Sequence, residues 1–119
     1  MKLRIHSIGD KGNLDKEVIW IEALEDVADL SYYLVCDTTY TNDNRISNEL
    51  RHAFWFPKQS VKKGDWIALH TKNGKKSSAS NNSGTTTHRF YWNLGRTIWN
   101  KDGDCAVLFK LETWKAQKG

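Results

Sequence analysis

Glu17-Val-Ile-Trp-Ile-Glu-Ala-Leu24 is the stretch of sequence that decides the fold class. Neighbouring side chains of a β-strand point to opposite faces of the sheet. Ile19, Ile21 and Ala23 therefore share one face, while Trp20 lies on the other. Because both faces are partly apolar, we expect this strand to be central in a sheet or to contact a partner.

The same alternation of apolar and polar residues extends outward along the chain. It predicts further strands at about residues 2–8, 30–37, 52–56, 66–71, 89–92 and 105–111. No segment of ten or more residues has a convincing helical period. Several short strands separated by turns predict an all-β sandwich or barrel, and we expect a sandwich of about seven strands.

Size and charge limit the possible classes of protein. The chain has 119 residues with 39% apolar content and a net charge of +4, which predicts one folded domain over residues 1–119 with a basic surface. The residues after Met1 alternate and do not form the apolar core of a secretory signal, and no stretch approaches the roughly 20 apolar residues of a membrane span. We therefore expect a cytoplasmic protein. The two cysteines, Cys36 and Cys105, are predicted to be free thiols rather than a disulfide.

A polar stretch interrupts the strand pattern. Residues 72–88 contain one alanine and no larger apolar residue. Such a segment cannot contribute side chains to a core, so the sequence predicts a mobile loop at about residues 73–87.

The order and spacing of four groups of residues match those of a known family. These groups are Glu17–Glu22, Asp29–Tyr33, Phe56–Pro57 with Val61 and Gly64, and Trp99–Asn100 with Gly103, Asp104 and Leu108. In this order they resemble the lamin tail domain, a family found in nuclear lamins and in many bacterial proteins. The resemblance implies an immunoglobulin-like β-sandwich in which Phe56 and Trp99 anchor the core. It also implies a binding module for protein, DNA or cell surfaces, without a conserved enzyme activity.

Catalytic and metal-binding patterns are weak. None of the four histidines (His6, His52, His70 and His88) lies two to four residues from another histidine or a cysteine, so no zinc spacing is present. Asn100–Asp104 resembles the start of a calcium loop, but the sixth position is Cys105 and the twelfth is Leu111 instead of Gly and Glu. A hairpin turn at Lys101–Gly103 explains these residues better. We expect no enzyme activity, no cofactor and no metal.

The aromatic residues give the functional prediction. Phe54 and Phe56 share one face of their strand, and Ile67 and Leu69 share one face of theirs, so Trp55 and Trp66 point away from the core. The sequence predicts a binding surface formed by the residues Trp55, Trp66, Lys58, Lys62 and Lys63. It favours binding to a protein partner or self-association. Weak, sequence-independent nucleic-acid binding is the alternative, and a covering segment around Trp114 is another explanation for the outward indoles.

Overall fold

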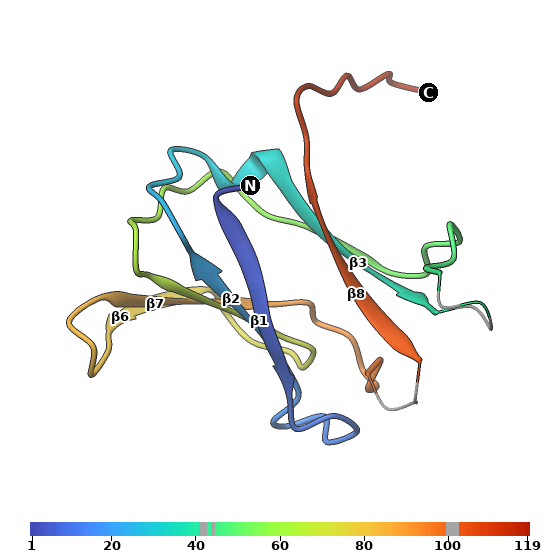
Figure 1. Ribbon diagram of the computed structural model, residues 1–119, viewed down its shortest axis with the longest axis horizontal. Coiled ribbons are helices and arrows are strands. Elements are labelled where there is room, and N and C mark those ends of the chain that lie inside the picture. The colour runs from blue at the N-terminus through green and yellow to red at the C-terminus, as the bar shows by residue number, and fades with distance from the viewer. Residues whose placement is uncertain (41–42, 44, 100–102) are drawn as a thin grey trace.

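The computed structural model describes residues 1–40, 43, 45–99 and 103–119, and it consists of two packed β-sheets (Figure 1). Its elements are β1 (Leu3–Gly9), β2 (Val18–Ala23), the short 3-10 helix η1 (Leu30–Tyr32), β3 (Tyr33–Thr39), β4 (Ala53–Trp55), β5 (Trp66–His70), β6 (Ser77–Ser80), β7 (Thr86–Tyr91) and β8 (Asp104–Lys110). In the described part of the chain, no helix is long and apolar enough to cross a membrane.

The strands are divided between a five-stranded and a three-stranded sheet. The larger sheet has the order β1-β2-β5-β7-β6, and the smaller sheet has the order β4-β3-β8. All pairings are antiparallel except the one between β5 and β7. The predicted all-β sandwich is therefore confirmed, with eight strands in the described residues where about seven were expected. As the alternation predicted, β2 is a central strand, with β1 on one side and β5 on the other.

The core lies between the sheets and is built from the apolar face of each strand. Trp99 and Phe56 are 1% and 2% exposed, so both predicted anchors are buried. Phe56 packs edge-on against Phe90, with the ring centroids 5.2 Å apart. The other core side chains belong to Leu3, Ile19, Ile21, Ala23, Val27, Leu30, Tyr33, Val35, Val61, Ile67, Leu69, Phe90 and Ile98.

A β-bulge in β1 adjusts which side chains face the core. The register with β2 shifts between Ile5 and Ser7, so His6 is an extra residue in the ladder. A bulge of this kind re-aims the side chains around it. Ile5 and Ile8 both pack against the core, while the His6 ring lies against Trp66 on the outer face of the sheet.

The segment 73–87 was predicted to be a mobile loop, but most of it belongs to a β-hairpin. Residues of β6 pair with β7 from Ser77 opposite Arg89 to Ser80 opposite Thr86. The side chain of Asn81 fixes the turn by accepting hydrogen bonds from the backbone N–H groups of Ser83 and Thr85. An edge strand can have exposed polar side chains on both faces, and its backbone hydrogen bonds do not require apolar residues.

Two smaller expectations concern the segment before β3 and the turn before β8. Leu30–Tyr32 forms a 3-10 turn, and the predicted strand begins only at Tyr33. Most of the proposed hairpin turn and calcium-like segment, residues 100–102, lies outside the described residues.

Both cysteines are free, as predicted: Cys36 is buried, and Cys105 is half-buried. Burial raises the pKa of the Cys36 thiol.

The burial of the two aromatic anchors leads to a stability prediction. Trp99→Ala and Phe56→Ala should each lower the free energy of unfolding by about 3–5 kcal/mol, because each substitution leaves a large cavity in a closed core. Urea denaturation followed by circular dichroism measures this loss. Leu50→Ala is the control, because Leu50 is exposed and its loss should stay within about 0.5 kcal/mol. Losses below about 1 kcal/mol at Trp99 or Phe56 would contradict their role.

Candidate functional site

The structure places the two predicted binding tryptophans on different sheets. Trp55 ends β4 of the three-stranded sheet, whereas Trp66 begins β5 of the five-stranded sheet. Both indoles point away from the core, as the alternation predicted. They do not form one patch, however, because the outer faces of two packed sheets lie on opposite sides of the molecule. The structure therefore does not bring Trp55 and Trp66 together, and a binding role for either residue stays a prediction.

The C-terminal segment lies against the Trp55 ring. Trp114 packs edge-on against Trp55 with the centroids 5.1 Å apart, and it packs against Tyr32 at 5.0 Å. Trp55 Nε1 also donates a hydrogen bond to the carbonyl of Ser31. Trp55 is still 51% exposed. A covering segment around Trp114, which was one of the alternatives for the outward indoles, therefore accounts for part of this surface.

Lys58 lies near the turn that contacts Trp55. Hydrogen bonds from Ser31 hold the pKa of Asp29 below its usual range, and the positive charge of Lys58 acts in the same direction. The segment that follows β4 therefore places Lys58 close to the turn on which Trp55 rests. The described structure thus associates Lys58 with Trp55.

Trp66 lies in an aromatic cluster on the outer face of the five-stranded sheet. Its ring is perpendicular to that of Trp20, with the centroids 6.3 Å apart, and His6 packs edge-on against it at 5.2 Å. These three side chains line an open pocket of about 510 Å³ together with Ser7, Asn81, Asn82, Ser83 and Thr87. We refer to this pocket as the Trp66 groove. It combines aromatic walls with a few amides and hydroxyls, which is the usual composition of a recognition site.

The strand register explains how two large indoles fit side by side. Across β2 and β5, Trp20 is opposite Ala68 and Glu22 is opposite Trp66. The small side chain of Ala68 leaves space between the bulky residues, and Ala68 is completely buried although it lies on the outer face. The guanidinium of Arg89, opposite Ala68 on β7, lies 5.8 Å from the Trp20 ring. This face is therefore aromatic and positively charged.

A tight turn brings the predicted lysines beside the Trp66 groove. Lys63 and Gly64 line a second, smaller hollow with Glu22 and Trp66. The backbone N–H of Lys62 donates to Asp65, and that of Lys63 donates to Asp26. Gly64 has a φ of +90°, which a residue with a side chain rarely adopts. The turn is thus fixed, and the side chains of both lysines are exposed.

Beyond the groove, the outer face continues into a polar stack. The rings of His70 and Tyr91 stack at 4.9 Å, and Arg89 donates a hydrogen bond to His70 Nε2. Burial, with the positive charges of Arg89 and Lys72, lowers the pKa of His70 to about 4. His70 is therefore neutral at pH 7, and the positive charge of this region resides on Arg89.

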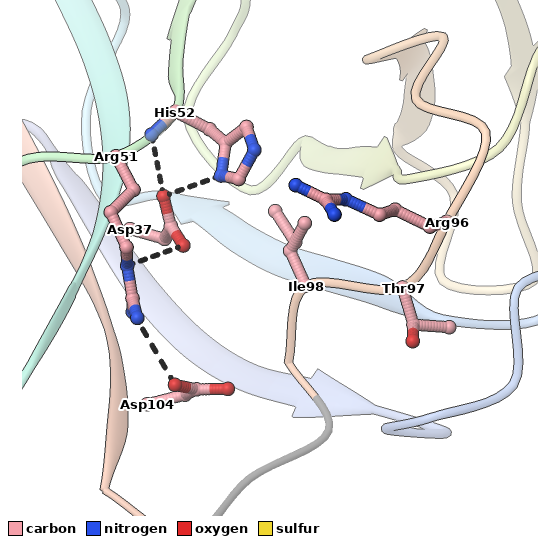
Figure 2. A pocket seen from close by; sticks show the side chains of 7 residues that line it. All are labelled: Asp37, Arg51, His52, Arg96, Thr97, Ile98 and Asp104. Atoms are coloured by element: carbon pink, nitrogen blue, oxygen red, sulfur yellow. Dashed lines mark hydrogen bonds and ion pairs between the residues drawn. The ribbon is translucent and has the colours of Figure 1, made fainter.

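Sequence reasoning did not identify a polar pocket at the end of the sandwich. Asp37, Arg51, His52, Arg96, Thr97, Ile98 and Asp104 line a pocket of about 340 Å³ (Figure 2). These residues come from four separate segments of the chain. Spacing within any one segment therefore gives no signal, and only the strand pairing that brings β3 beside β8 could have indicated the cluster.

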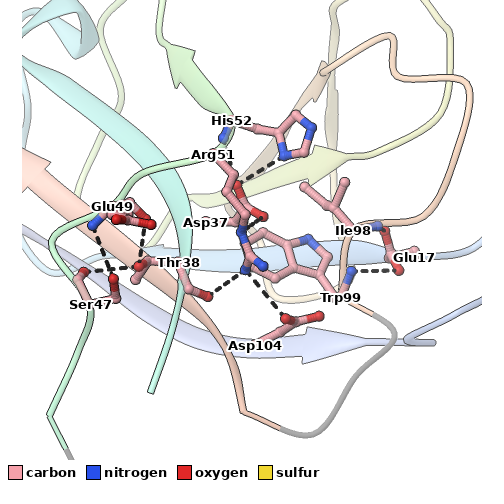
Figure 3. A network of polar contacts seen from close by, with 10 residues as sticks. All are labelled: Glu17, Asp37, Thr38, Ser47, Glu49, Arg51, His52, Ile98, Trp99 and Asp104. Carbon is pink, nitrogen blue, oxygen red and sulfur yellow. Dashed lines mark hydrogen bonds and ion pairs between the residues drawn. The ribbon is translucent and has the colours of Figure 1, made fainter. Parts of the chain in front are cut away.

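Behind this pocket, a buried carboxylate holds the chain that leads to Trp99. Glu17 is 0% exposed. Its oxygens accept hydrogen bonds from the Ile98 and Trp99 N–H groups (Figure 3). They also accept from the N–H of Gly12 and the hydroxyl of Thr71. Glu17 thus ties the 98–99 segment to the start of β2.

Asp65 and His88 form a buried acid–base pair. His88 Nε2 is 2.9 Å from Asp65 Oδ2, and its Nδ1 contacts Gln59 and Ser78. Asp65 also accepts hydrogen bonds from the N–H groups of Lys62 and Thr86. These bonds lower the pKa of Asp65 despite the opposing effect of its burial. The pair therefore joins the lysine turn to β7.

Within the described residues, no group of three or more His, Cys, Asp or Glu side chains could hold a metal ion. Comparison of the chain with protein-family models, with curated proteins and with solved structures found no match. The functional proposal therefore depends on the geometry of the site.

The Glu17 contacts lead to a second stability prediction. Glu17→Gln replaces one acceptor oxygen with an amide N–H₂ group that faces a backbone donor. We expect a loss of about 1–3 kcal/mol for each donor left without a partner. Urea denaturation measures the loss, and Thr71→Val is the matched control because it removes only one hydroxyl donor. Equal stability of Glu17→Gln and the unmodified protein would show that the carboxylate does not hold this segment.

The Trp55–Trp114 contact leads to a third prediction. Trp114→Ala should increase quenching of the tryptophan fluorescence by acrylamide, because Trp55 loses its cover. The loss of stability should be about 0.5–1.5 kcal/mol, the usual value of an aromatic pair. Trp114→Phe keeps a ring in place and should preserve most of the stability. Unchanged accessibility of the remaining indoles in Trp114→Ala would indicate that the C-terminal segment does not rest on Trp55 in solution.

Proposed function

We propose that this protein is a non-catalytic binding module that holds an acidic segment of a partner protein in the Trp66 groove. The observation that carries the proposal is the perpendicular pair of half-buried indoles, Trp20 and Trp66, in the wall of an open pocket. Large aromatic side chains in such pockets contribute most of the energy of many protein interfaces.

The chemistry around the groove supports a peptide-like occupant. An apolar side chain of the partner fits between the aromatic walls, and the amides of Asn81 and Asn82 can bond to a backbone. Lys62 and Lys63 on one side and Arg89 on the other supply positive charge. Acidic residues beside the apolar anchor would complement these charges and speed association.

The resemblance to the lamin tail domain is consistent with this proposal. Several residues that carry the resemblance are in the core, among them Tyr33, Phe56, Val61 and Trp99. We propose that the chain is a lamin-tail-like, immunoglobulin-like sandwich. That family implies binding rather than catalysis, and the sandwich alone does not specify the partner.

Nucleic-acid binding is the second candidate, and one contact favours it. The Arg89 guanidinium lies over the Trp20 ring, and indoles next to cationic groups are the surfaces on which unpaired bases stack. The two candidates differ in their dependence on salt and sequence. Binding to any single strand, weakened steeply by added salt, would favour nucleic acid.

Peptide display tests the proposed function. A random peptide library selected on the intact protein should yield acidic peptides with an aromatic or aliphatic anchor. Trp66→Ser should weaken their binding on the order of 30-fold, the effect expected for a central aromatic residue. Lys63→Glu should also weaken binding, because it reverses a charge beside the groove. Thermal unfolding establishes that each variant is folded.

Trp55→Ser is the matched control, because it removes an outward indole from the other sheet. Full binding by Trp55→Ser and loss by Trp66→Ser would support the groove. The reverse pattern would move the site to the Trp55 surface. Salt-sensitive binding to unrelated oligonucleotides, with no selected peptide, would favour the second candidate, and dimerisation that Trp66→Ser abolishes in sedimentation would identify a second copy of the chain as the occupant.

A further inference from the structure

Segments from different parts of the chain face each other across the polar pocket at the end of the sandwich. One side is formed by Asp37 of β3 and by Arg51 and His52, which precede β4. The facing side is the Arg96–Ile98 segment, and Asp104 at the start of β8 closes the base (Figure 2). We refer to this site as the Arg96 pocket. It lies away from the Trp66 groove and shares no lining residue with it.

The acidic side chain of Asp37 is fully engaged by protein donors. Asp37 is only 2% exposed. Its Oδ1 accepts from the His52 backbone N–H at 2.7 Å and lies 3.0 Å from His52 Nδ1, while its Oδ2 lies 3.3 Å from Arg51 Nε. Asp37 therefore orients two basic side chains, and its oxygens are not directed at a ligand.

Arg51 is also occupied by the protein. Its Nη2 donates to the carbonyl of Thr38 at 2.8 Å and lies 3.3 Å from Asp104 Oδ1 (Figure 3). Its guanidinium forms ion pairs with the two aspartates on either side. Arg51 thus joins β3 to β8 and is not the group that a ligand would meet.

Two basic groups remain directed into the pocket. Figure 2 shows the Arg96 guanidinium pointing toward the His52 ring from the opposite wall. Within the described residues, Arg96 makes no hydrogen bond or ion pair. Because Asp37 faces Nδ1 of His52, the Nε2 atom is left on the pocket side. A cationic fork and an imidazole facing one another are suited to an anion between them.

The balance of charge and the shape of the pocket indicate which anion. Asp37 and Asp104 balance Arg51 and Arg96, so the lining is neutral when His52 is neutral and carries one positive charge when His52 is protonated. One anionic charge would restore neutrality, whereas a phosphate dianion would exceed it beside two aspartates. The planar fork of one arginine also matches a carboxylate.

We propose that the Arg96 pocket binds a carboxylate group, held by the Arg96 guanidinium and by Nε2–H of protonated His52. Asp37 acts behind His52 as a positioning residue, since it accepts the Nδ1–H and leaves Nε2 toward the ligand. The pocket, about 340 Å³, has room for the atoms that carry the carboxylate as well. Either a chain terminus or a small carboxylic acid could supply this group.

In this arrangement, the atom that His52 presents to the ligand depends on its protonation. Neutral His52 presents a lone pair at Nε2, which repels a carboxylate, and protonated His52 presents a donor. The charged groups that face His52 are Asp37 and Asp104 from the strands, Arg51 beside it, and Arg96 from the opposite wall. A carboxylate should therefore bind more tightly to the form of the protein in which Nε2 carries a proton, and its affinity should be higher at lower pH.

NMR titration of the intact protein tests the proposal. N-acetylglycine supplies a free carboxylate with a short chain, and N-acetylglycinamide is its uncharged counterpart. The His52 ring signals should shift in a saturable way with the acid at about pH 6, and the shift should need several-fold more ligand at about pH 8. The amide should have no effect. Acetate tests whether the carboxylate alone suffices, and short peptides with free or amidated C-termini test a chain terminus.

Variants separate this site from general charge effects. Arg96→Gln should weaken binding roughly tenfold or more, because it removes the charged fork. Arg96→Lys should retain part of the affinity. Arg4→Gln is the matched control, since it removes one positive charge that pairs with Glu22 on the other sheet. His52→Gln should retain weak binding that no longer depends on pH.

Several results would overturn the proposal: equal shifts with acid and amide, undiminished binding by a folded Arg96→Gln protein, or tighter binding of inorganic phosphate than of the carboxylate. The test is independent of the proposed peptide site. Trp66→Ser should leave the N-acetylglycine titration unchanged, so failure at one site can be distinguished from failure at the other.

Discussion

The buried carboxylate of Glu17 is the constraint on which much of this structure depends. A buried charge is tolerated only when hydrogen bonds replace the water it has lost. Glu17 obtains those bonds from the 10–17 turn, from the residue after β5 and from the 98–99 segment. One side chain therefore joins three parts of the chain that are distant in sequence. Trp99 can fill the core because its backbone is held there, and Arg96 stands three residues before Trp99.

Strand alternation predicted much of the fold but not the neighbours of each side chain. It correctly separated the core face of Ile67 and Leu69 from the outward Trp66, and the resemblance placed Phe56 and Trp99 in the core. The alternation could not show that β4 and β5 belong to different sheets. Orientation follows from a local period of two residues, whereas adjacency depends on strand pairing across the whole chain. The predicted surface around Trp55 and Trp66 therefore divided into two.

Composition was also an incomplete guide to structure and sites. The polar segment before β7 has no side chains for a core, yet its backbone completes the edge of the five-stranded sheet. A bulge at His6 and a small residue at Ala68 shape the Trp66 groove, and neither has a distinctive sequence signal. The polar pocket is assembled from segments up to 67 positions apart, Asp37 and Asp104 being its first and last members. Motif spacing can identify only those sites whose residues lie close together in the sequence.

The two proposed sites differ in how their residues are held in place, and this difference has consequences for binding. The indoles of the Trp66 groove stand on adjacent central strands, so little conformational entropy remains to be lost when a partner docks. The Arg96 pocket is assembled differently: His52 is fixed by Asp37, while the Arg96 side chain is exposed on a connecting segment. Ordering a long arginine side chain costs part of the binding energy. A rigid aromatic groove is therefore suited to steady association, and the Arg96 pocket to a weaker contact whose strength varies with proton concentration.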